Sequence, residues 1–263
     1  MKILFVGDIS GSPGRKMLER VLAKVQWEHN IDFTVVNGEN SAGGVGIHTK
    51  AYHFFMDLGI DAITMGNHTW DNKDVFNIMA RSESLIRPLN LPENTPGRGY
   101  AILPCGDKKV AVINLLGRVF LGIPPADCPF RAMDKLLKEL EQITPYVLVD
   151  FHAEATSEKI ALAYYLDGRV SAVLGTHTHV QTNDARVLPR GTAYITDAGM
   201  TGPRDSCLGV DTEPIIERFL TGRPARFHVA TGPEQIFNAV VVELQENGKA
   251  KSITTINLED TLI

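Results

Sequence analysis

The chain has 263 residues, 44% of them hydrophobic, and a formal net charge of −5 at pH 7. This is enough for one substantial core, and the acidic balance excludes the basic surface that holds long nucleic acids. Three widely spaced cysteines without a CxxC pair, no apolar run of roughly 18 residues and no secretory signal predict a soluble, cytoplasmic protein without disulfides or a membrane span.

The first 80 residues alternate between apolar strands and helices with helical spacing of their apolar positions. The predicted strands lie at 2–8, 32–40 and 61–68, and the predicted helices at 17–25, 51–59 and 71–80. Because the strands are almost continuously apolar, they suit burial on both faces of a sheet. This β-α-β-α-β order predicts an α/β fold.

The rest of the chain continues the pattern with paired strands and further helices. We expect strands at 100–105, 108–116, 146–154, 171–180 and 192–199, helices at 133–142 and 213–220, and a hairpin at 237–259. Asn247 and Gly248 supply the turn of that hairpin. No repeat, long linker or low-complexity segment interrupts the chain, so residues 1–263 are predicted to form a single domain with a mixed sheet system or two packed sheets.

Five of the predicted strands end in polar residues. The strand ends read GD at 7–8, NGEN at 37–40, GNH at 66–68, DFH at 150–152 and GTHTH at 175–179. Taken singly, such residues are most often turn formers or satisfied core polar groups. Because sites in open α/β sheets lie outside the carboxyl ends of the strands, we expect all five to meet in one crevice.

The two histidines of GTHTH indicate what the crevice binds, because imidazole is the commonest metal ligand. If this segment is extended, His177 and His179 point to the same side with Cα atoms roughly 6.5 Å apart. Two metals in a hydrolytic site lie about 3.5–4 Å apart, so each histidine could reach a different ion while Glu39 or Asp8 bridges them. Nitrogen and oxygen ligands without thiolate favour Mn, Fe, Zn or Co.

The order of these motifs resembles the calcineurin-like metallophosphoesterase superfamily. GDISGSPGR, NGENSAGG, GNHTWDN, DFHAEATSEK, GTHTHVQT and TDAGMTGPRDS are similar to the YmdB-like branch over almost the whole chain. The resemblance implies a four-layer α/β/β/α metallophosphoesterase sandwich with two mixed sheets. It also implies a dinuclear metal centre that hydrolyses small phosphodiesters, with 2′,3′-cyclic nucleotides such as 2′,3′-cyclic AMP as the substrate class.

The resemblance further implies a role for each polar residue at the strand ends. One metal would be held by Asp8, Glu39, Asn40 and His179, and the other by Glu39, Asn67, His152 and His177. His68 would face the substrate as the proton donor. The cofactors would be two divalent or trivalent transition-metal ions, with iron preferred over manganese and zinc.

Two positions depart from the broad superfamily. Ser10 stands where a histidine ligand is usual, and Asn40 would fill that gap. Glu39 of NGEN replaces the usual bridging aspartate of a GDxxD motif. Both changes suit the YmdB-like branch.

Several alternatives stay open at the level of sequence. Asp150 and Glu154 could orient His152 or lie at the surface, and Arg204 in the 196–206 loop could contact phosphate or solvent. The same metal ligands would serve a phosphomonoesterase or nucleotidase, or a regulator that senses nucleotides without hydrolysing them. The sequence also leaves the oligomeric state open, with a homo-oligomer as one possibility.

Overall fold

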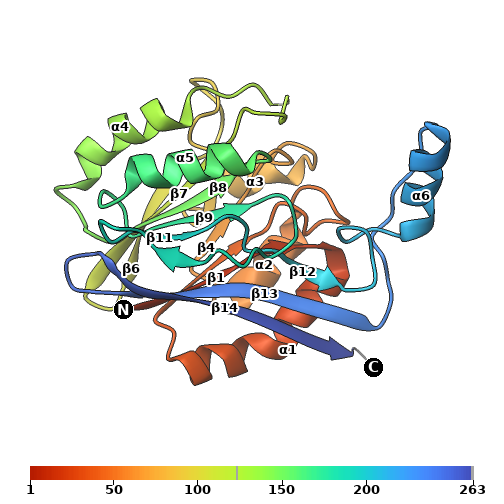
Figure 1. Cartoon of the computed structure of the whole chain (residues 1–263), viewed down its shortest axis with the longest axis horizontal. Helices are drawn as coiled ribbons and strands as arrows, with labels where there is room; N and C mark the ends of the chain where they lie inside the picture. The colour runs from red at the N-terminus through yellow and green to blue at the C-terminus, as the bar shows by residue number, and fades with distance from the viewer. Residues whose placement is uncertain (123, 262–263) are drawn as a thin grey trace.

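Two mixed β-sheets pack face to face, and helices cover the outer face of each (Figure 1). The computed structural model describes residues 1–122 and 124–261. Its four layers are the α/β/β/α sandwich that the sequence predicts, with two mixed sheets. The fold prediction is therefore confirmed.

The first sheet has eight strands in the order β2-β12-β13-β1-β3-β4-β5, with β14 pairing with β13. Their bounds are β1 Lys2–Val6, β2 Asp8–Ile9, β3 Phe33–Asn37, β4 Ala62–Thr64, β5 Leu85–Ile86, β12 Met200–Pro203, β13 Glu234–Leu244 and β14 Ala250–Thr261. Strands β1, β3, β4 and β5 are parallel, and β13 runs antiparallel to β1. The predicted hairpin is the β13–β14 pair, with Gly248 at φ 80° in its turn.

The second sheet has six strands in the order β10-β11-β9-β8-β7-β6. Their bounds are β6 Tyr100–Cys105, β7 Lys108–Leu116, β8 Val147–His152, β9 Ala172–Thr176, β10 Arg186–Val187 and β11 Ala193–Ile195. Strands β7, β8, β9 and β11 are parallel, so their carboxyl ends lie along one edge of the sheet.

The helices are α1 Gly11–His29, α2 Thr49–Asp57, α3 Asp74–Met79, α4 Pro129–Leu140, α5 Thr156–Leu166 and α6 Thr212–Thr221. The first three pack on the first sheet, α4 and α5 cover the second, and α6 stands away from the body without a buried residue (Figure 1). Helix α5 was not predicted, because its apolar residues run consecutively (IALAYYL) and leave no helical stripe in the sequence. Among the described residues, no helix is long and apolar enough to cross a membrane.

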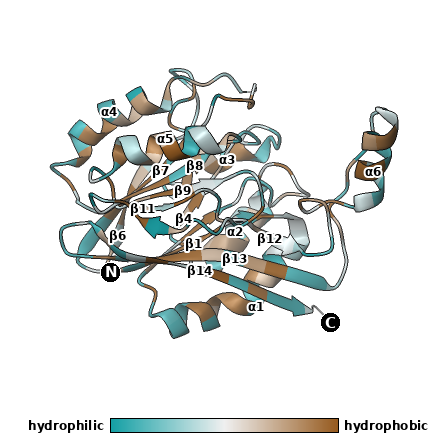
Figure 2. Ribbon diagram, viewed as in Figure 1, coloured by the Kyte–Doolittle hydropathy of each residue, from teal (hydrophilic) through white to brown (hydrophobic). Residues whose placement is uncertain are grey.

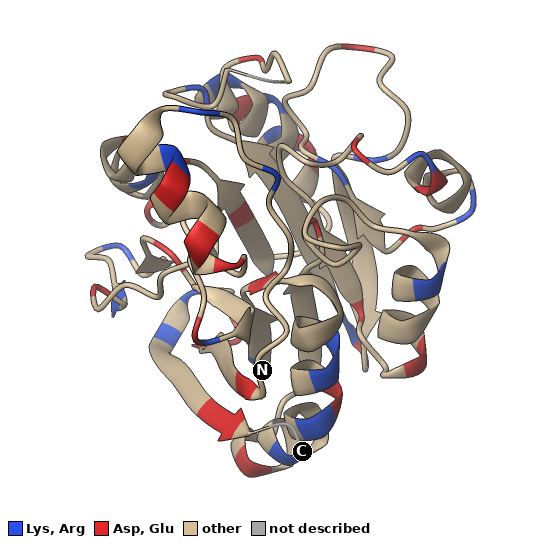
Figure 3. Cartoon of the chain, turned by 90° about the vertical axis from the view of Figure 1, so that its right-hand side faces the viewer, with Lys and Arg blue, Asp and Glu red and all other residues tan. Residues whose placement is uncertain are grey.

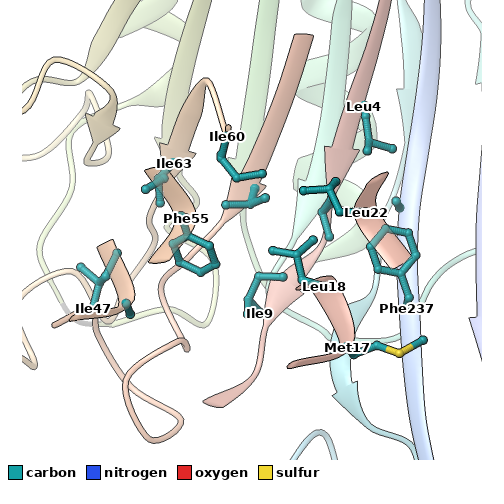
Figure 4. Packing of buried hydrophobic residues seen from close by; sticks show 14 of the residues in the cluster. Leu4, Ile9, Met17, Leu18, Leu22, Ile47, Phe55, Ile60, Ile63 and Phe237 are labelled. Carbon is teal, nitrogen blue, oxygen red and sulfur yellow. The ribbon is translucent and has the colours of Figure 1, made fainter. Parts of the chain in front are cut away.

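Strand alternation explains how one strand serves two cores, because successive side chains point to opposite faces. In β1, Ile3 and Phe5 lie between the two sheets, whereas Leu4 and Val6 lie on the side of α1. Figure 2 shows the hydrophobic strands inside and hydrophilic segments on the outer helices, and Figure 4 shows Leu4 in the cluster with Leu22 of α1. Apolar residues on both faces of β1 thus hold three layers together.

Charged residues of both signs are interspersed along the outer elements, as the colouring of the cartoon in Figure 3 shows. Some of them form ion pairs between neighbouring elements. Arg20 of α1 contacts Asp260 of β14 at 2.8 Å, and Lys251 of β14 contacts Glu243 of β13 at 2.7 Å. Because exposed ion pairs typically contribute only about 0–1 kcal/mol each, the buried apolar side chains provide most of the stability of the fold.

Replacing Phe5 by alanine should lower the free energy of unfolding by about 3–5 kcal/mol, because the fully buried ring leaves a cavity between the sheets. Phe219→Ala is the matched control, since that ring is 86% exposed on α6, and it should change stability by no more than about 0.5 kcal/mol. Denaturant unfolding followed by circular dichroism measures both. Equal losses would contradict the placement of Phe5 in the core.

Candidate metal centre

Three side chains from separate strand ends converge on one atom of a fourth, Nε2 of His152. This nitrogen lies 3.0 Å from Oε1 of Glu39, 2.8 Å from Oδ1 of Asn67 and 3.0 Å from Nδ1 of His177. Glu39 follows β3, Asn67 follows β4, His152 ends β8 and His177 follows β9. Both sheets therefore contribute to a single site, as the order of the strand ends predicts.

The hydrogen bonds behind His152 assign its tautomer. Its Nδ1 lies 2.9 Å from the hydroxyl oxygen of Thr176, and that hydroxyl donates its one hydrogen to Oδ1 of Asp150 at 2.7 Å. Thr176 must then accept a hydrogen from Nδ1 of His152. Asp150 is buried and also accepts from Thr64 and Asn37, so of the two alternatives left open for Asp150 the surface position is excluded, and its link to His152 runs through Thr176. Nε2 of His152 consequently faces the site.

The other two histidines are fixed in the same way. Nε2 of His177 contacts Oε2 of Glu154 at 2.9 Å, which leaves Nδ1 to face the site. Nδ1 of His179 contacts the carbonyl oxygen of Leu208 at 3.0 Å, which leaves its Nε2 available. Metal-binding histidines almost always donate their second ring N–H to such oxygen atoms. Of the two alternatives that the sequence leaves open for Glu154, the surface position is the one observed, and its partner there is His177 rather than His152.

The arrangement of lone pairs fits a cation. Glu39, His152 and His177 each offer a ligand atom, and these atoms all lie within 4.8 Å of one another. Asp8 and Asn40 are buried, and among the described residues no group donates a hydrogen bond to Oδ1 of either side chain. Buried acceptors are costly unless they have a partner. A metal ion satisfies such oxygen and nitrogen atoms at once, so the residues present suit a metal centre.

The electrostatics of the site agree with this interpretation. Burial raises the pKa of Asp8 to about 6, against the attraction of His179 and His152. Burial alone would lower the pKa of His152, but Glu39 and Asp8 raise it to about 9. A proton on Nε2 of His152 and a metal ion are thus alternative ways to balance Glu39, and metal binding releases that proton. Burial and the neighbouring His152 lower the pKa of His177 to about 3, which keeps its imidazole neutral.

His68 lies at the edge of this cluster. Its backbone N–H donates to Oε2 of Glu39 at 3.2 Å, which ties the GNH turn to the site. Its Nδ1 lies 2.7 Å from Oδ2 of Asp71, so the carboxylate accepts the Nδ1 hydrogen and leaves Nε2 as the atom available for proton transfer. Sequence reasoning does not single out Asp71, because it meets His68 across a turn rather than on a helix, and such a contact leaves no periodic signal.

One sequence-based expectation about the surrounding loops is wrong. Strand β9 ends at Thr176, and His177 and His179 have φ angles of 101° and 65°. They do not lie on an extended segment, so strand geometry does not set their directions. Of the two alternatives left open for Arg204, its ion pairs with Asp205 at 2.9 Å and Glu259 at 2.8 Å favour a surface position over a phosphate contact.

Comparison with known proteins assigns the chain to a family. The model of the YmdB-like protein family matches residues 4–256. A relative from Bacillus subtilis strain 168, named 2′,3′-cyclic-nucleotide 2′-phosphodiesterase, is 52% identical over 99% of this chain and 98% of its own length. The chain belongs to the YmdB-like family, and the resemblance predicted from its motifs is confirmed.

Two solved structures are similar over nearly their full length. A hypothetical protein from Thermus thermophilus is 44% identical with a TM-score of 0.92, covering 99% of this chain and 100% of the other. A structure from Mycoplasma pneumoniae described as a novel phosphatase is 35% identical with a TM-score of 0.93, covering 100% of this chain and 94% of the other. Both likenesses extend to the whole four-layer fold.

Gly66 gives a direct test of the site, because there is no room for a side chain. A Cβ atom there would lie 2.3 Å from Oε2 of Glu39 and 2.4 Å from Cδ2 of His152. Gly66→Ala should therefore lower the metal content of purified protein at least about tenfold, measured by elemental analysis. Gly232→Ala, where a Cβ meets nothing within 4 Å, should leave the metal content unchanged. Wild-type metal content in Gly66→Ala would contradict the close packing at this centre.

Proposed function

We propose that the chain, as one domain of residues 1–263, is a metal-dependent phosphodiesterase that hydrolyses 2′,3′-cyclic nucleotides such as 2′,3′-cyclic AMP. One observation supports this proposal most strongly: Oε1 of Glu39, Oδ1 of Asn67 and Nδ1 of His177 all lie within 3.0 Å of Nε2 of His152. The phosphodiesterase named among its relatives, 52% identical over nearly the whole chain, supports the substrate class.

The ligand set divides between two transition-metal ions, with iron preferred over manganese and zinc. Asp8, Glu39, Asn40 and His179 would hold one ion, and Glu39, Asn67, His152 and His177 the other. The unpartnered oxygen atoms of Asp8 and Asn40 support the first group, and the cluster around His152 supports the second. When bound, such ions lower the pKa of water and neutralise charge on phosphoryl oxygens.

The remaining chemical task is protonation of the departing alkoxide, and we assign it to His68. Its Nε2 would give up the proton while Asp71 holds Nδ1 and fixes the orientation of the ring. The backbone contact from His68 to Glu39 keeps the donor next to the ligand that both proposed ions share. General acid catalysis of this kind typically contributes about 10²–10⁴-fold.

A phosphomonoesterase is the second candidate, and the phosphatase from Mycoplasma pneumoniae favours it. Metal ligands alone do not distinguish a diester from a monoester, because both place phosphoryl oxygens next to the ions. The two candidates differ in the substrate that they turn over.

Metal-replete protein should hydrolyse 2′,3′-cyclic AMP and bis-nitrophenyl phosphate faster than nitrophenyl phosphate or a nucleoside monophosphate. Product analysis by liquid chromatography measures each rate under the same conditions. Turnover of monoesters alone would establish the second candidate instead. Binding of cyclic nucleotide without turnover would indicate a sensor and refute both enzymatic candidates.

His68→Ala should lower turnover of 2′,3′-cyclic AMP by about 10²–10⁴-fold and keep the metal content. Asp71→Asn should give a smaller loss, because it weakens the orientation of His68 but leaves the ring in place. The control is His53→Ala, an exposed histidine on α2, which should retain wild-type turnover. If His68→Ala keeps full turnover with metal bound, another group donates the proton.

A further inference from the structure

The segment 196–200 (TDAGM), which has no role in the proposed chemistry, lies against the loops that carry the metal ligands. The carbonyl oxygen of Gly199 accepts from the backbone N–H of Asp8 at 3.0 Å. Ala198 N–H donates to the carbonyl oxygen of Gly175 at 2.8 Å, and Met200 N–H donates to that of His179 at 3.1 Å. One short segment therefore joins both ends of the GTHTH loop to Asp8.

The side chain of Asp197 makes the most concentrated contacts of this segment. The carboxylate is fully buried, and its Oδ2 accepts from the backbone N–H of Thr178 at 3.0 Å and from the Thr178 hydroxyl at 2.7 Å. Nζ of Lys159 donates to the same oxygen at 2.8 Å, and Gly199 N–H donates to Oδ1 at 2.9 Å. Thr178 is the residue between His177 and His179. Asp197 therefore holds the centre of the GTHTH segment at residues 175–179 (the histidine loop).

The backbone conformation of the histidine loop is one that must be held in place by contacts with the rest of the protein. His177 and His179 both have φ in the left-handed region, which residues with a Cβ rarely adopt unless their surroundings impose it. Thr178 is held at both its N–H and its hydroxyl, so the loop cannot relax to an extended form without breaking two bonds to a buried carboxylate.

Lys159 lowers the free-energy cost of burying the Asp197 carboxylate. Its side chain is only 1% exposed, although it lies on α5, and its ammonium group compensates the buried charge of Asp197. A buried carboxylate without such a partner is strongly disfavoured. At Gly175 a Cβ atom would lie 1.7 Å from the carbonyl oxygen of Thr196 and 3.1 Å from Cδ of Lys159, so the loop, the segment and the lysine pack without spare room.

We infer that Asp197, charge-compensated by Lys159, is a positioning residue that sets His177 and His179 together for metal binding. The inference rests on the proposed function, in which the two histidines belong to different ions. Because Asp197 acts on the residue between them, its loss should weaken both metal sites. Loss of one histidine would remove a ligand from one site only.

Thr178 provides the mildest test, because Thr178→Val keeps the shape and removes only the hydroxyl bond to Asp197. Metal-free protein is titrated with Mn²⁺ by calorimetry, and the Kd of each site is compared with wild type. Thr178→Val should raise the Kd of both sites about tenfold, and Asp197→Asn should raise both about 100-fold. Thr178→Ser keeps the hydroxyl and should therefore bind with wild-type affinity. Circular dichroism checks that each variant is folded.

Thr192→Val is the matched control, since Thr192 is a buried threonine whose hydroxyl bonds the carbonyl oxygen of Val170 at 2.7 Å, next to the amino end of β11. It should lower thermal stability but leave both Kd values unchanged. Two results would overturn the positioning role: wild-type Kd values in Thr178→Val, or an equal loss of affinity in Thr192→Val. Neither result would contradict metal binding by the wild-type protein. Absence of Mn²⁺ binding by the wild type would overturn the proposed function together with this inference.

Discussion

The site depends on one electrostatic constraint. Buried nitrogen and oxygen atoms lie within hydrogen-bonding distance of one another, but they carry too few hydrogens to satisfy every lone pair. Nε2 of His152 lies within 3.0 Å of the oxygens of Glu39 and Asn67 and of a nitrogen of His177. A single proton on Nε2 can bridge only one of these pairs at a time, whereas a metal ion accepts lone pairs from all four atoms. The fold assembles this arrangement from two sheets, although the strands that carry it are far apart in the chain.

Two features of the fold maintain the constraint. Glycines allow the backbone to approach closely where a Cβ would collide, as at Gly66 beside Glu39 and at Gly7, where it would lie 1.8 Å from the carbonyl oxygen of Gly199. Each histidine also has its second ring nitrogen engaged by an oxygen atom of the protein, so its orientation does not depend on the ligand it binds. The site is thus largely organised by contacts outside the ligand set.

The sequence predicts the parts of the structure that follow from local pattern. Apolar strands, most helices and the polar residues at the strand ends could be recognised, because burial and position at the end of a strand leave a periodic or positional signal. The convergence of Glu39, Asn67, His152 and His177 follows from that reasoning together with the parallel order of the strands.

The contacts that orient the site could not be predicted in the same way. The left-handed φ of His177 and His179 depends on Asp197, which lies 19 residues beyond Thr178 in the chain. The choice of Glu154 as the partner of His177 depends on how β8 and β9 lie beside each other. Such contacts arise between segments in the folded chain and leave no periodicity in the sequence.

The most direct measurement is anomalous X-ray scattering from crystals of protein purified without added metal, recorded on both sides of the iron, manganese and zinc absorption edges. Two peaks about 3.5–4 Å apart, one beside His152 and His177 and one beside Asp8 and His179, are the predicted result. A well-ordered site with water alone between Glu39 and His152, even after crystals are soaked in these metals, would contradict the central claim that the buried lone pairs exist to hold cations.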